Sequence, residues 1–136
     1  MAVEWTKDLS VGVDFIDKQH QIWFQKANNL FEAGKQGKSS GIISQMLDFL
    51  DDYTKTHFRD EEKYMLEIHY PELSTQKKLH ESFIAELAKL KSEYKKTGGN
   101  VVVIISANQM VVNWLIQHIM VQDKKIGQFV KSQKDC

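Results

Sequence analysis

Apolar residues recur along this chain at intervals of three and four, the spacing of one face of an α-helix. Glycine and proline interrupt the pattern between Gly34 and Gly41, at Pro71, and at Gly98 and Gly99. A β-branched run at 101–105 is short, and we interpret it as the start of a helix buried by its neighbours. After an N-terminal arm, residues 1–13, the pattern predicts four helices, at about 14–36, 40–66, 71–96 and 100–131.

Residues at the expected helix starts support these limits. Asp14 can cap the first helix, and Ser39 or Ser40 can cap the second, because their side-chain oxygens accept hydrogen bonds from free backbone N–H groups. Pro71 fits the first turn of the third helix, and Asn100 can cap the fourth. Four helices of similar length with short links predict an all-α fold, an antiparallel up-down four-helix bundle in a single domain, residues 1–136.

Composition narrows the class of protein. Of the 136 residues, 18 are Lys or Arg and 18 are Asp or Glu, so no basic surplus is present to neutralise nucleic-acid phosphates. The one cysteine, Cys136, has no partner for an internal disulfide, which favours a reducing compartment. The first residues lack the features of a signal peptide, and no apolar run reaches membrane-spanning length. We therefore expect a cytoplasmic protein without a nucleic-acid or membrane partner.

Four histidines fall on the apolar faces of the four expected helices: His20, His57, His80 and His118. Glu61 joins them, one helical turn after His57. One such histidine would be read as a core residue that is hydrogen-bonded to a backbone carbonyl. Four imidazoles and a carboxylate in one small core must satisfy one another, because each unpaired buried polar group costs about 1–3 kcal/mol. A metal ion satisfies them together, and this ligand set suits iron, zinc or manganese.

Four segments in order along the chain also resemble one known family. They read VGVDFIDKQH, HFRDEEKYM, YPELSTQKKLHESF and WLIQHIMVQD. With them the chain resembles the hemerythrins over nearly its whole length, most closely the single-domain bacterial form, bacteriohemerythrin. The resemblance implies a non-haem centre of two carboxylate-bridged iron ions, which binds dioxygen reversibly inside the bundle.

The resemblance also implies a role for each ligand. His20 and His57 would hold the iron that leaves a position open for dioxygen, and His80 and His118 would hold the other iron. Glu61 and Asp123 would bridge the two metals. Asp123 lies five residues after His118, about 140° further round an ideal α-helix, so periodicity alone would not select it.

Gln76 departs from the family pattern. The family places a third histidine for the second iron at this position, one turn before His80, and this chain has a neutral amide there. Three outcomes are open at this stage. The amide oxygen ligates the metal, or a water takes the position while the amide hydrogen-bonds to it, or the second metal binds weakly and is lost.

The oxygen pocket follows from the same resemblance, which implies an apolar wall formed by Phe58, Trp114, Leu115 and Ile119. A dry wall keeps protons and competing anions away from the ligand. Plain core packing would place these four side chains in the same way. The wall offers no general acid or base, which argues against a dedicated oxygenase.

Two classes of function remain. The first is a dioxygen-binding protein that does no chemistry on its ligand: a carrier, store or sensor, serving an oxygen-requiring enzyme or a redox partner. The second is an enzyme, a di-iron peroxidase or oxygen scavenger made possible by Gln76; iron or nitric oxide handling is a weaker alternative. We favour the first. Apart from Glu61, the charged residues between 48 and 63 are expected to form mostly a solvated face, and His69 is expected to lie exposed in a loop.

Overall fold

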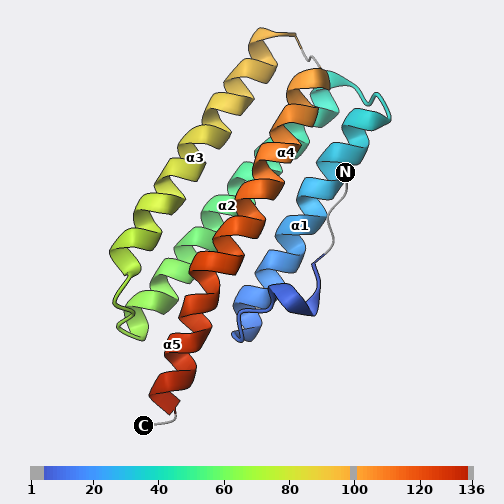
Figure 1. Cartoon of the computed structure of the whole chain (residues 1–136). Helices are drawn as coiled ribbons and strands as arrows, with labels where there is room; N and C mark the ends of the chain where they lie inside the picture. The colour runs from blue at the N-terminus through green and yellow to red at the C-terminus, as the bar shows by residue number, and fades with distance from the viewer. Residues whose placement is uncertain (1–4, 99–100, 135–136) are drawn as a thin grey trace.

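The computed structural model describes residues 5–98 and 101–134, apart from the side chains of 40, 101, 107, 108 and 134. Its helices are η1 (Lys7–Leu9), α1 (Asp14–Lys35), α2 (Ser40–Glu67), α3 (Leu73–Lys96), α4 (Val101–His118), η2 (Ile119–Asp123) and α5 (Lys124–Lys134). The last three form one continuous rod that runs antiparallel to α3, as α2 does to α1 (Figure 1). The predicted all-α bundle is confirmed.

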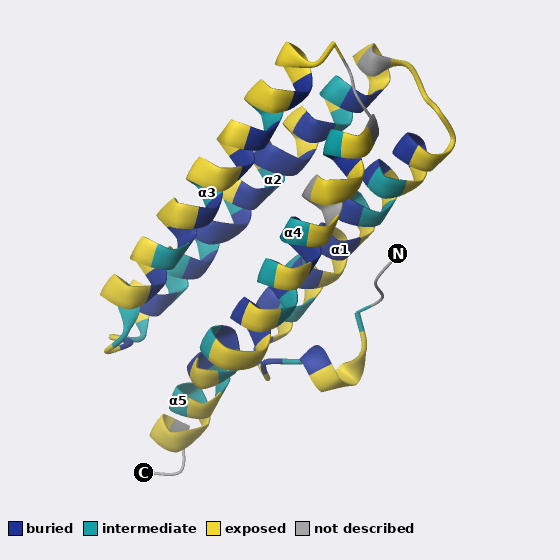
Figure 2. Ribbon diagram, turned by 45° about the horizontal axis from the view of Figure 1, so that its top comes forward, coloured by how far each residue is buried: buried dark blue, intermediate teal, exposed yellow. Residues whose placement is uncertain are grey.

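The bundle closes as a ring of helices. α1 packs against α2 and α4, and α3 packs against α2 and, less extensively, α4. Each helix turns its buried face inward and its exposed face to solvent (Figure 2). This arrangement follows from the three-and-four spacing, because residues at that spacing share one stripe of a helix. Large apolar side chains such as Trp23, Leu47 and Leu87 fill the interior.

The helix starts agree with the sequence at one place and differ at two. Ser39 caps α2, since its hydroxyl accepts a hydrogen bond from the backbone N–H of Ile42 at 3.3 Å. The cap expected at Asp14 is wrong: Asp14 is the first helical residue, and Val13 precedes it without a side-chain cap. Pro71 also lies outside its helix, because α3 begins at Leu73. The cap expected at Asn100 lies outside the described residues.

The turn after α2 explains why the third helix starts late. The backbone N–H of Tyr70 donates to the carbonyl of Met65 at 2.9 Å, and that of His69 donates to the carbonyl of Leu66 at 3.2 Å. These bonds close the end of α2 with His69 in the left-handed region, at φ 57°. Pro71 therefore belongs to the turn between the helices. His69 is exposed, as expected.

The N-terminal arm lies against the bundle. Leu9, Val11 and Val13 are buried. Asp17 of α1 holds the arm, because it accepts hydrogen bonds from the backbone N–H of Val11 at 2.8 Å and from the hydroxyl of Ser10 at 2.6 Å. The arm thus fixes the start of the helix that carries His20.

One helical stretch within the described residues, Val102–Gln133, is long and apolar enough to cross a membrane by length and composition alone. Buried core helices pass the same test, so this is a weak indication. The expectation that the protein has no membrane partner stays a prediction.

Candidate metal centre

The four histidines come together at the middle of the bundle, one from each of α1, α2, α3 and α4. His20, His57 and His80 are fully buried, and His118 is 5% exposed. The Nε2 atoms of all four are buried and have no hydrogen-bond partner among the described residues. Four inward-facing nitrogen atoms with free lone pairs are what a metal site requires of its imidazoles.

Glu61 lies between the histidines and gives one oxygen to each side. Its Oε2 is 3.3 Å from Nε2 of His57 and 3.8 Å from Nε2 of His20. Its Oε1 is 3.1 Å from Nε2 of His80. The carboxylate therefore faces both pairs of histidines.

Asp123 also gives one oxygen to each pair of histidines. Its Oδ2 lies 3.2 Å from Nε2 of His20, and its Oδ1 lies 3.2 Å from Nε2 of His118. The side chains form two groups whose potential ligand atoms all lie within 4.8 Å of one another: His20, His57, Glu61 and Asp123, and then Glu61, His80 and His118. The groups share Glu61, while Asp123 also reaches His118 of the second.

The π-helical turn η2 accounts for the position of Asp123. In a π-helix each residue bonds to the fifth residue along, so a residue five positions after His118 returns to the same face. An ideal α-helix would carry Asp123 about 140° away. The sequence pattern could not select this residue because the helix changes its period between Ile119 and Asp123.

Two side chains behind the histidines set their orientation, and the sequence pattern missed both. Nδ1 of His57 donates to Oε1 of Gln19 at 2.6 Å, and Nδ1 of His80 donates to the carboxylate of Glu62 at 2.8 Å. With the proton held at Nδ1, each Nε2 is left as the free lone pair that faces the centre. The amide of Gln19 is held in turn by Asp60, to which its Nε2 donates at 3.0 Å.

These bonds correct the expectation of a solvated charged face on α2 at three positions, while the other five charged residues are exposed as expected: Asp48, Asp52, Lys55, Arg59 and Lys63. Glu62 and Asp60 serve the histidines, and Asp51 is buried and accepts from Lys55 at 3.1 Å and Lys91 at 3.2 Å. The only sign of these roles in the sequence is that Asp51, Asp60 and Glu62 each stand next to a residue of the inward stripe. It is weak, because hydrogen bonds between helices depend on tertiary geometry.

Burial and mutual charge set the protonation of the centre. Burial lowers the pKa of His57, which favours the neutral imidazole that a metal binds. Burial opposes charge on Asp123, but His118 and His20 outweigh it and hold the pKa of this carboxyl well below its usual range. Burial and the charge of Asp123 oppose ionisation of Glu61, yet His57 and His80 lower the pKa of this carboxyl too. Burial also opposes charge on His80, but Glu61 and Glu62 outweigh it and raise the pKa of this imidazole. The centre therefore combines anionic oxygen donors with a His57 that burial keeps neutral, and a metal at His80 would have to displace a proton.

Gln76 lies inside the same centre. It is fully buried on α3, and its Nε2 donates to Oδ1 of Asp123 at 3.0 Å. Its Oε1 is buried and has no hydrogen-bond partner in the part of the chain that the structure describes. The amide thus contacts the carboxylate oxygen that faces His118.

Aromatic rings cover the histidines. Phe58 stacks on the ring of His80 with centroids 3.8 Å apart, and Trp114 stacks on His118 at 4.3 Å. Leu115 and Ile119 are fully buried on the same helical rod. Phe58 is nearly fully buried and Trp114 is half-buried. Three of the four residues predicted for the pocket wall lie in the core and Trp114 packs against it, and Phe58 and Trp114 directly contact the histidines.

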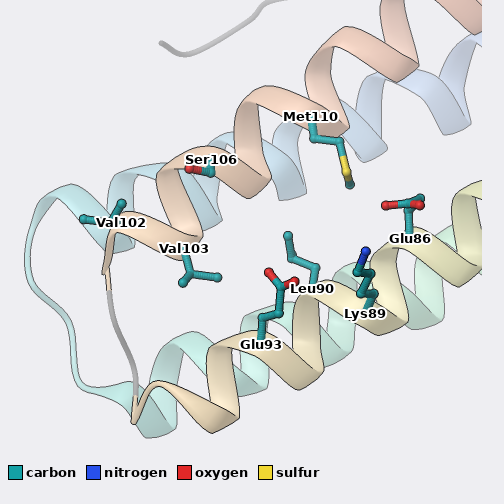
Figure 3. A pocket seen from close by; sticks show the side chains of 8 residues that line it. All are labelled: Glu86, Lys89, Leu90, Glu93, Val102, Val103, Ser106 and Met110. Carbon is teal, nitrogen blue, oxygen red and sulfur yellow. The ribbon is translucent and has the colours of Figure 1, made fainter.

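A separate hollow lies away from this centre, between α3 and α4 toward the end of the bundle that carries the α3–α4 link (Figure 3). It has a volume of about 280 Å³. Leu90 and Met110 contribute apolar surface, and Glu86 and Glu93 contribute charge. None of the histidines lines it, so the chemistry indicated by the sequence lies in the core.

The residues present fit a pair of metal ions. Orphaned Nε2 atoms and two carboxylates that each face both pairs of histidines need positive charge between them. Imidazole nitrogen with carboxylate oxygen suits iron, zinc or manganese. Such a pair can bind a small ligand wherever the protein leaves a metal position without a side chain.

Comparison with known proteins gives a consistent picture. The family model described as the hemerythrin HHE cation binding domain matches residues 11–130. A bacteriohemerythrin of Stenotrophomonas maltophilia is 30% identical over 128 residues, 94% of this chain and 81% of that protein. A bacteriohemerythrin of Methylococcus capsulatus is 32% identical over 124 residues, 90% of this chain and 92% of that protein. Myohemerythrin-1 of Phascolopsis gouldii is 28% identical over 121 residues, 89% of this chain and 88% of that protein.

A solved structure agrees as well. A crystal structure of wild-type hemerythrin superposes with a TM-score of 0.83 at 27% identity, and the match covers 94% of this chain and 97% of the other.

Proposed function

The chain belongs to the hemerythrin family, and from this premise we propose that it is a non-haem di-iron protein that binds dioxygen inside its bundle. One observation carries the proposal: two buried groups of ligand atoms share the carboxylate of Glu61, and Asp123 reaches the histidines of both. We propose a binding role, as a carrier, store or sensor. We also propose that the protein works in the cytoplasm, beside an oxygen-requiring enzyme or a redox partner.

We propose six residues as the metal ligands. His20 and His57 hold the iron with an open position, and His80 and His118 hold the second iron. Glu61 and Asp123 bridge the pair. The clustering of the ligand atoms supports this division, because His20 and His57 fall in one group and His80 and His118 in the other.

When bound, the iron pair supplies reversible electron transfer to dioxygen, the chemistry that the side chains lack. The side chains supply geometry and dryness. Gln19 and Glu62 hold the protons of His57 and His80 at Nδ1, away from the centre. Phe58, Leu115 and Ile119 exclude water, which would bring protons and competing anions.

We propose that Gln76 positions Asp123 and leaves one place at the second iron to water. Its amide N–H already donates to the carboxylate of Asp123 at 3.0 Å. Its remaining oxygen, neutral and buried, is a weaker ligand than an imidazole and can accept a hydrogen bond from that water.

The same residue supports a second candidate function. An iron with a replaceable water could turn over peroxide or dioxygen, which would make the protein a peroxidase or an oxygen scavenger. Iron or nitric oxide handling would also use an exchangeable position. A carrier releases its ligand unchanged, whereas a peroxidase or a scavenger converts the ligand before it leaves.

The test is an oxygen cycle on the protein loaded anaerobically with ferrous iron. A carrier shows a visible absorption band that forms in air, disappears under vacuum and returns. Immediate and irreversible oxidation identifies redox turnover, and binding of fewer than two irons per chain contradicts the di-iron proposal.

Gln76→His separates the two functions. In a carrier it should change dioxygen affinity modestly, because the open position lies on the other iron. In an enzyme that uses the exchangeable position it should largely abolish peroxide turnover. Gln25→His, at an exposed position on α1, is the matched control and should change neither quantity.

A further inference from the structure

Trp23 carries a polar group that the proposed centre does not use. It lies on α1, one turn after His20, and is fully buried. Its indole N–H has no hydrogen-bond partner among the described residues. A buried donor without an acceptor is unfavourable, so this N–H calls for an acceptor that comes from outside the chain.

The neighbours of the indole ring place it beside the first pair of histidines. Its centroid lies 5.1 Å from that of His57 and 6.3 Å from that of His20. Phe58 at 5.4 Å, Phe83 at 5.9 Å and Trp114 at 6.3 Å form the rest of its aromatic surroundings.

None of these rings accepts a hydrogen bond from the indole, although both ring nitrogens of His20 are themselves without a partner among the described residues. The phenylalanine rings have no polar atom, and Nδ1 of His57 already donates to Gln19. Nε2 of His57 lies 3.3 Å from a carboxylate oxygen of Glu61, on the side where a metal would lie. Trp23 therefore contributes a buried hydrogen-bond donor without an acceptor to a largely aromatic wall.

We infer that the Trp23 indole N–H donates a hydrogen bond to the small ligand, dioxygen or a small anion, that enters beside His20 and His57. This inference rests on the proposed function. An indole keeps its proton, so it stabilises negative charge on the ligand without releasing a proton that would drive the ligand off. Trp23 acts as a ligand-binding residue that favours acceptors able to carry negative charge.

The test uses azide as the probe on the oxidised, iron-loaded protein. Trp23→Phe keeps an aromatic ring and removes the N–H. It should weaken azide binding about tenfold, as measured by visible absorption, because hydrogen bonds to charged acceptors are among the stronger ones. A loss of threefold or more supports the inference, and a smaller change overturns it.

Trp5→Phe is the matched control. The indole N–H of Trp5 is also buried and finds no partner within residues 5–98 and 101–134, but it lies in the N-terminal arm, beside Phe24 and Gln25 rather than the histidines. The same substitution there should leave the azide affinity unchanged. Equal losses in the two variants would overturn the inference, because the effect would then come from packing in general.

A second measurement does not depend on how Trp23→Phe folds. Ultraviolet resonance Raman of the protein with its native Trp23 reports hydrogen bonding at the indole N–H groups of its three tryptophans. Azide should shift this signal toward stronger hydrogen bonding. The shift should be the same in Trp5→Phe, which lacks the indole of Trp5. An unchanged spectrum at saturating azide overturns the inference alone. Iron-loaded protein that takes up no azide overturns the proposed function as well.

Discussion

At the scale of single residues, the hydrogen bonds behind the histidines matter as much as the ligands themselves. Glu62 accepts from His80 at 2.8 Å and Gln19 accepts from His57 at 2.6 Å. Each bond fixes one tautomer and one ring orientation. The metal affinity of this centre therefore depends on two side chains that would never touch the metal.

Glu62→Ala should lower iron affinity about 10- to 100-fold, the usual effect of losing such a partner. Without this acceptor the ring of His80 can rotate, and its proton can move to Nε2. Iron release to a competing chelator measures the change. Glu67→Ala, which removes an exposed carboxylate from the same helix, is the control. Equal iron retention in both variants would show that Glu62 is only a surface acid.

The sequence could predict the histidines but not these partners. The spacing of three and four selected His20, His57, Glu61, His80 and His118, because all share the stripe of core residues. Gln19 and Glu62 are chain neighbours of that stripe and look like surface residues in any one helix. Gln19 meets Asp60 across 41 positions of sequence, a contact that exists only after α1 and α2 pack.

At the scale of helices, the π-helical turn η2 is the feature that completes the centre. The family resemblance predicted Asp123 as a ligand, while α-helical periodicity pointed it away from His118. The turn resolves the difference, because it takes up one extra residue and returns Asp123 to the inward face. A local change of period cannot be seen in a pattern that assumes 3.6 residues per turn.

Removing and adding a residue in η2 should have opposite effects. Deletion of Met120, an exposed residue, should convert the turn to α-helix and keep Asp123 and α5 near their present faces. Insertion of an alanine at this point should rotate Asp123 and α5 by about 100° and abolish iron binding. In each variant, iron content measures metal binding and the thermal unfolding midpoint measures stability. Comparable losses in the two variants would contradict the proposed role of this turn.

The contact between the N-terminal arm and α5 gives another test at this scale. A Cβ on Gly127 would lie 1.6 Å from the backbone oxygen of Val11. Gly127→Ala should therefore push the arm away and reduce the free energy of unfolding by about 1–3 kcal/mol. Chemical denaturation measures it. Gly41→Ala, where a Cβ meets nothing within 4 Å, should leave stability unchanged or slightly raised. A Gly127→Ala variant as stable as this control would mean that the arm does not pack as described.

At the scale of the whole molecule, the bundle brings four distant stretches of sequence to one buried point. The apolar pattern was sufficient to predict the all-α antiparallel bundle, because each helix has one apolar stripe and short links force neighbours to run in opposite directions. Helix starts were less predictable. The turn closed by His69 and Tyr70 displaced the third helix past Pro71, and such turn geometry is decided by local hydrogen bonds.

The central claim is that this bundle holds two irons between six side chains. Anomalous diffraction from crystals of the iron-loaded protein, collected at the iron absorption edge, tests it most directly. We predict two iron peaks, one beside Nε2 of His20 and His57 and the other beside Nε2 of His80 and His118. Both should contact the carboxylates of Glu61 and Asp123. A single peak, or peaks away from these carboxylates, would contradict the claim.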